Sequence, residues 1–209
     1  MAVILPSLAS ANTADLKGEI SRLGGYPYLH FDIEDGNFVD NITFGLKTIS
    51  AVRKLSDADF DAHLMVTDPL KYIKPLAELC FQSVSFHWES TMYPMRIIHE
   101  IKKYGMKAGI ALNPATPAEA VSEYLSAVDR ILVMASEPDG AGELFQKRVL
   151  EKICRIRKLN GRIHILVDGG VDPEIMEIAV EAGADMIVMG RAVFGSPDPE
   201  AFLREHNCG

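Results

Sequence analysis

One pattern limits the fold of this chain more than any other. Short apolar runs recur roughly every two dozen residues, and a charge-rich amphipathic segment follows each run. Such an alternation is typical of repeated strand–helix units. The runs are continuous and not alternating, so we expect both faces of each strand to be covered. There are eight, at residues 3–5, 28–32, 60–65, 83–87, 108–112, 130–134, 163–168 and 186–189.

The segments between these runs are predicted helices. Residues 68–69, 116–117 and 172–173 are Asp-Pro or Thr-Pro pairs, which combine a capping side chain with a proline in the first helical turn. Gly105 and Gly183 follow two of the segments, where a left-handed glycine can end a helix. The predicted helices cover residues 15–23, 46–55, 69–79, 94–104, 117–125, 144–159, 173–182 and 199–206.

Eight strand–helix units in 209 residues predict the α/β class and a (β/α)8 TIM barrel. The right-handed crossover rule leaves few competing topologies, of which a doubly wound open sheet is the runner-up. No linker or change of composition divides the chain, so we expect residues 1–209 to form a single domain.

Charge and cysteine content exclude several classes of protein. The formal net charge of -8 argues against sequence-independent nucleic-acid binding. Three cysteines without a CxxC pair argue against structural disulfides. The chain opens without the basic start of a signal peptide, and no apolar run has membrane-spanning length. We therefore expect a cytoplasmic protein with neither a nucleic-acid nor a membrane partner.

Chemically active side chains gather at the carboxyl ends of the predicted strands, where TIM barrels place their active sites. His30 and Asp32 lie on the second strand, His63 on the third, and Asp168 ends the seventh. Two imidazoles and two carboxylates suit one divalent ion such as Zn²⁺, Fe²⁺, Mn²⁺ or Co²⁺, which would also neutralise the repulsion between the carboxylates. The other strand ends contribute Ser7, Met65, His87, Asn113, Met134, Ser136, Gly190 and Arg191.

Several of these positions have a second interpretation. A lone strand histidine such as His30 is more often a hydrogen-bonded core residue than a ligand, and His87 fits either role. Met65 and Met134 are by default core residues. Asp32 and Asp168 are harder to assign to a core, because a buried carboxylate needs a partner.

Glycine-containing loops indicate a phosphate site. Gly169 and Gly170 follow the seventh strand, and Gly190 precedes Arg191 after the eighth. TIM barrels commonly bind phosphate at these two loops through backbone N–H groups, and an arginine there would add a charge-assisted contact. A third loop, after the sixth strand, contains Gly140 and Gly142.

Six blocks of sequence stand in a characteristic order: PSLASAN at residues 6–12, HFDIEDGNFVDNITFG at 30–45, DAHLM at 61–65, LNPATP at 112–117, VM at 133–134 and VDGGV at 167–171. In this order they resemble the ribulose-phosphate 3-epimerase family, and the resemblance spans nearly the whole chain. It implies a metal-dependent enzyme that inverts C3 of a ketose phosphate. It implies no organic cofactor, and because the family is commonly oligomeric we expect a homo-oligomer.

The resemblance also implies roles for individual residues. The metal ligands would be His30, Asp32, His63 and Asp168. Asp32 and Asp168 would also act as base and acid on opposite faces of the substrate, in a two-base proton transfer through an enediolate. The implied substrate contacts are Ser7, His63, Met65, Met134, Gly140, Gly142, Gly169, Gly170, Gly190 and Arg191.

Three departures from the family pattern indicate a diverged subgroup. Glu34 replaces the usual methionine on the strand face of Asp32, where it either faces the metal and substrate or turns to a cationic neighbour. Residues 137–143 read EPDGAGE where the family usually has NPGFGGQ, which adds negative charge near the expected phosphate. Arg191 replaces a residue that is commonly serine. We therefore expect the substrate to be ribulose 5-phosphate or a related pentulose or hexulose phosphate.

Two other functions remain open. A sugar-phosphate lyase or decarboxylase on the same scaffold would typically carry Asp-x-Lys-x-x-Asp on the second or third strand, but Glu34 stands where the lysine would be. A non-catalytic phosphosugar-binding protein would keep the site without turnover, and the altered loop is the reason to consider it. The presence of all four metal-type residues argues against that second alternative.

Overall fold

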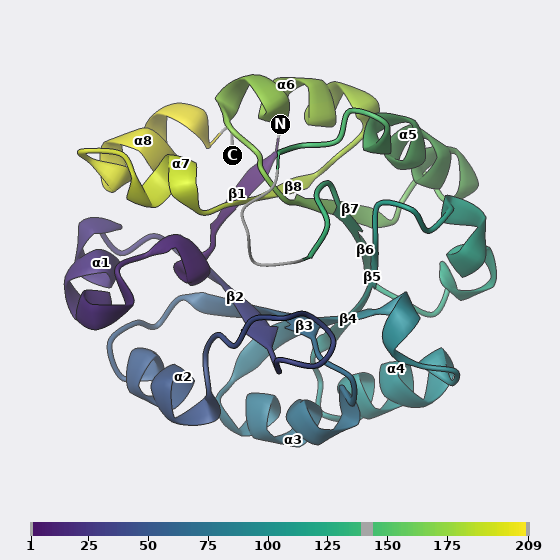
Figure 1. Ribbon diagram of the computed structural model, residues 1–209, viewed down its shortest axis with the longest axis horizontal. Helices are drawn as coiled ribbons and strands as arrows, with labels where there is room; N and C mark the ends of the chain where they lie inside the picture. Colours follow the sequence, from purple (N-terminus) through teal and green to yellow (C-terminus); the bar gives the residue numbers. More distant parts are fainter. Residues whose placement is uncertain (1, 139–143, 208–209) are drawn as a thin grey trace.

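Eight parallel strands form an inner ring, and the helices form an outer ring around them (Figure 1). The computed structural model describes residues 2–138 and 144–207. Neighbouring strands pair in the order β1-β8-β7-β6-β5-β4-β3-β2, and a parallel bridge between Ser7 and His30 joins the two ends of the sheet. The strands are β1 (Val3–Pro6), β2 (Tyr28–Glu34), β3 (Asp59–Met65), β4 (Phe81–His87), β5 (Lys107–Leu112), β6 (Arg130–Met134), β7 (His164–Asp168) and β8 (Met186–Met189).

Helical segments connect the strands because each can pack an apolar stripe against the outer face of the sheet. One of them, α4, buries Ile97, Ile98 and Ile101 on one side. The α-helices are α1 (Leu16–Arg22), α2 (Leu46–Arg53), α3 (Leu70–Glu78), α4 (Pro94–Lys103), α5 (Val149–Leu159), α6 (Pro173–Ala182), α7 (Arg191–Phe194) and α8 (Pro199–His206). The 3-10 helices are η1 (Leu8–Ser10), η2 (Thr13–Asp15), η3 (Trp88–Ser90) and η4 (Ala118–Tyr124).

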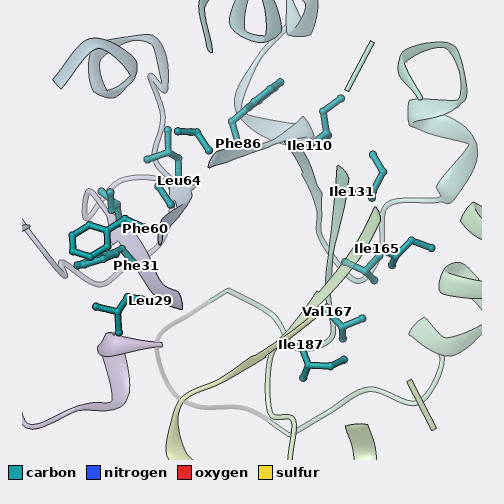
Figure 2. Close-up of a cluster of buried hydrophobic side chains, with 14 of the residues drawn as sticks. Leu29, Phe31, Phe60, Leu64, Phe86, Ile110, Ile131, Ile165, Val167 and Ile187 are labelled. Carbon is teal, nitrogen blue, oxygen red and sulfur yellow. The ribbon is translucent and has the colours of Figure 1, made fainter. Parts of the chain in front are cut away.

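Apolar side chains form two layers of core. The outer layer lies between strands and helices, and Figure 2 shows side chains such as Phe31, Phe86 and Ile165 directed away from the barrel centre. The inner layer fills the barrel with Leu5, Ala111, Leu132, Met134, Leu166 and Val188. Both faces of the strands are thus covered, as the continuous apolar runs predict.

The predicted (β/α)8 barrel is confirmed. The doubly wound open sheet is wrong, because β8 pairs with β1 and the sheet comes round on itself. Gly105 and Gly183 have φ angles of 77° and 114°, the predicted left-handed conformation. In the described part of the chain, no helix combines the length and hydropathy needed to cross a membrane.

The helix starts follow the predicted signals only in part. Asp172 caps α6 by accepting a hydrogen bond from the Ile175 N–H, as expected. Before α3 and η4, however, the prolines Pro69 and Pro117 themselves stand at the N-cap, and neither helix has a side-chain cap. The predicted caps there are wrong by one residue. Pro117 is extended, so the chain turns into η4 after this proline, whereas Pro69 already has helical backbone angles and α3 begins at the next residue.

Two predicted helices differ in the structure. The helix predicted over residues 117–125 is the 3-10 helix η4 (Ala118–Tyr124), whose buried residues, Ala118 and Val121, have the three-residue spacing that this tighter winding places on one side. The helix predicted over residues 144–159 begins only at Val149. The Gln146 N–H donates instead to the carbonyl of Ala135, the residue after β6 (2.7 Å), and this contact holds Gln146 out of the helix.

Candidate active site

The carboxyl ends of the strands surround a cavity of about 460 Å³. Its lining includes these predicted site residues: Ser7, Asp32, Glu34, Met65, Met134, Ser136, Asp168, Gly169, Gly170, Gly190 and Arg191. His30, His63 and His87 are fully buried and lie behind this lining, and Asn113 lies outside it. The positions of Gly140 and Gly142 fall outside the described residues.

Strand register brings the metal-type residues together. Asp32 on β2 pairs with His63 on β3, and two residues earlier His30 pairs with Asp61. Since side chains alternate along a strand, these four share the inner face, and Phe31 packs on the outer one. Asp168 ends β7 on the far side of the barrel, and its carboxylate reaches the same point.

Four donor atoms meet there, all within 4.8 Å of one another: His30 Nε2, Asp32 Oδ1, His63 Nδ1 and Asp168 Oδ2. His63 Nδ1 lies 3.2 Å from Asp32 Oδ1 and 3.1 Å from Asp168 Oδ2. His30 Nε2 lies 3.3 Å from Asp32 Oδ1 and 3.7 Å from Asp168 Oδ2. This cluster of four donors could hold a metal ion.

The donor spacing fits a metal ion of borderline softness. Bonds of about 2.0–2.2 Å around a four-coordinate ion place neighbouring ligand atoms about 3.3–3.6 Å apart. The four measured contacts lie close to that range. Imidazole nitrogen combined with carboxylate oxygen suits Zn²⁺, Fe²⁺, Mn²⁺ or Co²⁺.

Without a bound cation, the two imidazoles of the cluster favour their protonated form. Burial opposes ionisation throughout the cluster, but the charges and hydrogen bonds of Asp32 and Asp168 raise the pKa of His63 to about 9 and that of His30 well above its usual range. The same contacts hold the pKa of Asp32 and of Asp168 below their ordinary value. A divalent cation would therefore replace two imidazole protons with the same total charge.

A buried group that the sequence interpretation missed supports His30. The Asp61 carboxylate accepts from His30 Nδ1 at 2.8 Å and from the Ser83 hydroxyl at 2.5 Å. Arg130 Nη1 lies 2.9 Å from Asp61 Oδ1, the oxygen that also accepts from Ser83, and its charge holds the pKa of Asp61 low against the effect of burial. Asp61 stands two residues before His63, so strand alternation alone would have placed it on the inner face.

His87, whose role the sequence left open, is buried beside His63. Its Nε2 lies 2.9 Å from His63 Nε2, and its Nδ1 lies 3.2 Å from Glu89 Oε2. Burial lowers the pKa of His87 to about 4. Glu89 also accepts from the Asn113 N–H (3.0 Å) and from the Thr116 hydroxyl. Sequence reasoning did not single out Glu89, which lies in the short 3-10 helix η3 directly after β4.

Glu34 lines the cavity beside Asp32. Its partner is the neutral side-chain amide of Asn41, which donates to Oε2 at 2.7 Å, so the expected alternative of a cationic neighbour is wrong. Burial and the charge of Asp32 raise the pKa of Glu34 to about 7. An extra carboxyl group thus faces the space where a substrate would lie.

Both glycine loops line the cavity, and the first has a backbone conformation that favours glycine. Gly169 and Gly170 have φ angles of 113° and 65°, and a Cβ at Gly169 would lie 2.7 Å from the backbone nitrogen of Ser136. Gly190 lies against Ser10, and Arg191 begins the short helix α7. These residues, with Ser136, form one side of the cavity.

Comparison with known proteins identifies the family. The sequence model of the Ribulose-phosphate 3 epimerase family matches residues 3–194. The chain belongs to this family. Membership makes it an isomerase of the epimerase class. The sequence resemblance is thereby confirmed, and the three departures noted above are departures within the ribulose-phosphate 3-epimerase family.

Named relatives in this family cover nearly all of the chain. The ribulose-phosphate 3-epimerase of Bacillus subtilis is 37% identical over 212 residues, covering 98% of each chain. The enzyme of Mycobacterium tuberculosis is 39% identical over 203 residues, covering 95% of this chain and 89% of the relative. A cytoplasmic isoform from Oryza sativa is 40% identical over 204 residues, covering 95% and 90%.

Solved structures with low sequence identity share the epimerase's fold. The 3-hexulose-6-phosphate synthase of Salmonella typhimurium aligns with a TM-score of 0.74 at 16% identity, covering 98% of this chain and 96% of the other. The orotidine 5'-phosphate decarboxylase of Pyrococcus horikoshii aligns with a TM-score of 0.67 at 15% identity, covering 97% and 96%. At these identities the likeness concerns the barrel alone.

Proposed function

We propose that the protein is a metal-dependent epimerase that inverts C3 of a ketose phosphate, either ribulose 5-phosphate or a related pentulose or hexulose phosphate. The observation that carries this proposal is the convergence of Asp32 and Asp168 on one donor cluster in the cavity wall. Two carboxylates that come from strands on different sides of the barrel can flank one carbon of a bound sugar.

The two aspartates would exchange one proton with the substrate. One carboxylate removes the hydrogen at C3, and the other, in its protonated form, returns a hydrogen from the opposite face, so that the configuration inverts. Ser7 donates a 2.6 Å hydrogen bond to Asp32 Oδ2, the oxygen outside the four-donor cluster, and so holds that carboxylate in position. Restoring the starting enzyme requires one proton to pass between the aspartates and solvent.

A metal ion would be held by His30, Asp32, His63 and Asp168. When bound, it would supply the positive charge that stabilises negative charge on the substrate's oxygens after C3 loses its proton. A weakly acidic hydrogen beside a carbonyl requires such stabilisation, because a lone carboxylate is too weak a base.

The remaining cavity residues would bind the two other parts of the substrate. The phosphate would lie at the side formed by Gly169, Gly170, Gly190 and Arg191, because glycine-loop backbone and an arginine side chain are groups that commonly bind phosphate. Met65 and Met134, both buried, would contact the carbon chain. The expected homo-oligomer and the cytoplasmic location stay predictions.

The alternative lyase function is less well supported by the same cavity. Among the described residues that line it there is no lysine, the group beside which such enzymes stabilise a carbanion. A non-catalytic sensor would have no need for two aspartates in contact with one imidazole. The epimerase is therefore the function that this geometry favours.

The direct test is a panel of ketose phosphates. Purified protein supplied with Zn²⁺, Mn²⁺ or Co²⁺ should convert at least one pentulose or hexulose phosphate to its C3 epimer, detected by NMR of the sugar. If none is converted with any of these ions, the proposal is wrong. Release of CO₂ from an acidic sugar phosphate would favour the lyase instead.

A further inference from the structure

Behind the candidate metal site, the side chains of His87, at the end of β4, and Glu89, in η3, extend a chain of contacts from His63. His63 Nε2 and His87 Nε2 lie 2.9 Å apart, and His87 Nδ1 lies 3.2 Å from Glu89 Oε2. Both imidazoles are fully buried, and the Glu89 side chain is 24% exposed. We refer to His63, His87 and Glu89 as the relay.

The second oxygen of Glu89 fixes the orientation of its carboxylate. Oε1 accepts from the backbone N–H of Asn113 and from the Thr116 hydroxyl, which leaves Oε2 facing His87. Because a carboxylate only accepts, His87 must carry its proton on Nδ1 and present a lone pair at Nε2. His63 must then donate from its own Nε2, and its Nδ1 is the atom free to bind a metal.

The opposite arrangement is unfavourable at every step. A proton on His87 Nε2 would leave the Nδ1 lone pair facing a carboxylate. It would also require His63 to accept at Nε2 and to keep a proton on Nδ1, the atom that lies 3.2 Å from Asp32 and 3.1 Å from Asp168. A proton on that nitrogen excludes a metal ion, because a ligating imidazole must present a lone pair.

We propose that His87 and Glu89 are positioning residues that keep a proton on Nε2 of His63, so that Nδ1 is the nitrogen left to bind a metal ion. This inference rests on the metal dependence of the proposed function. Carboxylates commonly support metal-bound histidines directly, and here the support acts through a second imidazole. Asp61 has the direct version of this role for His30.

Substitution of Glu89 by glutamine should reverse the direction of the hydrogen bonds in the relay while keeping the size of the side chain. The Asn113 N–H is part of the backbone and cannot turn away, so the glutamine oxygen should take the Oε1 position and its NH₂ group should face His87. That NH₂ group donates to Nδ1, which moves the His87 proton to Nε2, against His63. Glu89→Ala instead removes the constraint and leaves His87 free to keep its original proton.

The test compares E89Q, E89A and the wild type, with Glu119→Gln as the matched control because Glu119 pairs with Arg155 on the surface away from the relay. Zn²⁺ affinity is measured by competition with a chromophoric chelator, and the His87 tautomer is read from ¹⁵N NMR of the metal-free protein. We expect E89Q to bind Zn²⁺ about 10- to 100-fold more weakly than the wild type. E89A should lose less, and E119Q should match the wild type.

The order of the two variants distinguishes the relay from a purely structural role. Glutamine keeps the volume of glutamate and alanine does not, so a structural role predicts that E89A is the worse variant. The inference is overturned if E89Q binds Zn²⁺ as tightly as the wild type, or if wild-type His87 carries its proton on Nε2. A wild type that binds no divalent ion would refute the proposed function itself, whatever the tautomer.

Discussion

Asp168 and Asp32 transfer the protons in the proposed reaction, so replacing one carboxylate oxygen of either by nitrogen should remove most of the activity. Asp168→Asn keeps the shape of the side chain but removes the proton acceptor and one anionic ligand. We expect the rate of C3 epimerisation to fall by at least about 100-fold with the fold unchanged, measured by NMR and circular dichroism. Asp172→Asn, four residues along the chain, is the control, because asparagine caps a helix as well as aspartate does.

Glu89 should also give a pH signature in stability. Burial opposes its ionisation, but hydrogen bonds from His87 and Thr116 lower the pKa of Glu89 from 4.5 to about 2. A carboxylate with a lowered pKa stabilises the folded state above its ordinary pKa, and that contribution is lost as the pH falls toward the folded value.

The free energy of unfolding of the wild type should therefore exceed that of E89Q by a constant amount above about pH 5, and the difference should shrink between pH 4.5 and pH 2. Urea denaturation of both proteins across this range measures it. A difference that stays the same at every pH would contradict the contacts assigned to Glu89.

At the residue scale, the sequence pattern predicted the residues that line the cavity better than the buried residues that hold them in position. The period of two along β2 placed His30, Asp32 and Glu34 on one face, and the structure agrees. Arg130 could not be found in this way, because a charged residue at the start of a strand is usually solvated. Glu89 lies in the 3-10 helix η3, which at three residues is too short to show a period.

At the scale of elements, Gly109 on β5 makes room for the Asp61–Arg130 pair. A Cβ at this position would lie 2.4 Å from the Ser85 hydroxyl oxygen and 2.8 Å from Arg130 Cγ, inside the barrel. Gly109→Ala should therefore lower the free energy of unfolding by about 1–3 kcal/mol, the usual cost of an overpacked core. Urea denaturation measures the change.

Gly161→Ala is the matched control for this element, since nothing lies within 4 Å of a Cβ there. We expect its stability to stay close to that of the wild type. Equal stabilities for G109A and the wild type would show that Arg130 does not occupy the interior space assigned to it.

Helices and strands were predicted correctly where the apolar pattern is strong. They were predicted wrongly where contacts between distant segments determine where an element begins. All eight strands were found, because each is covered on both faces. The start of α5 at Val149 was not, since the Gln146 N–H pairs with β6, and pairing between distant segments leaves no local signal. The short helix α7 was also missed, because four residues show no period.

At the scale of the whole molecule, metal binding should couple to folding. Four donor residues, three of them buried and Asp168 partly buried, are held together only in the folded barrel, so an ion that binds them stabilises the native state. Zn²⁺ at 100 times its dissociation constant should raise the free energy of unfolding by about 2.7 kcal/mol. Asp32→Asn should lose this response, whereas Asp198→Asn, at the cap of α8, should keep it.

The barrel itself follows from the eightfold repetition, which leaves few ways to cover every strand on both sides. The oligomeric state does not follow from this repetition, because it depends on surface residues whose pattern is not periodic. The sequence predicted a closed barrel, but it did not predict that Ser7 and His30 form the bridge that closes it. That bridge places the Ser7 hydroxyl beside Asp32 and so connects the closing of the barrel to the site.

Hydrogen exchange at C3 tests the proposed function most directly. In D₂O, the metal-loaded protein should convert a ketose phosphate to its C3 epimer with one deuterium from solvent at C3, because the hydrogen returned is not the hydrogen removed. Chelation of the metal should abolish both the conversion and the label. An epimer formed with its original C3 hydrogen, or no exchange with any ketose phosphate tested, would contradict proton transfer by Asp32 and Asp168.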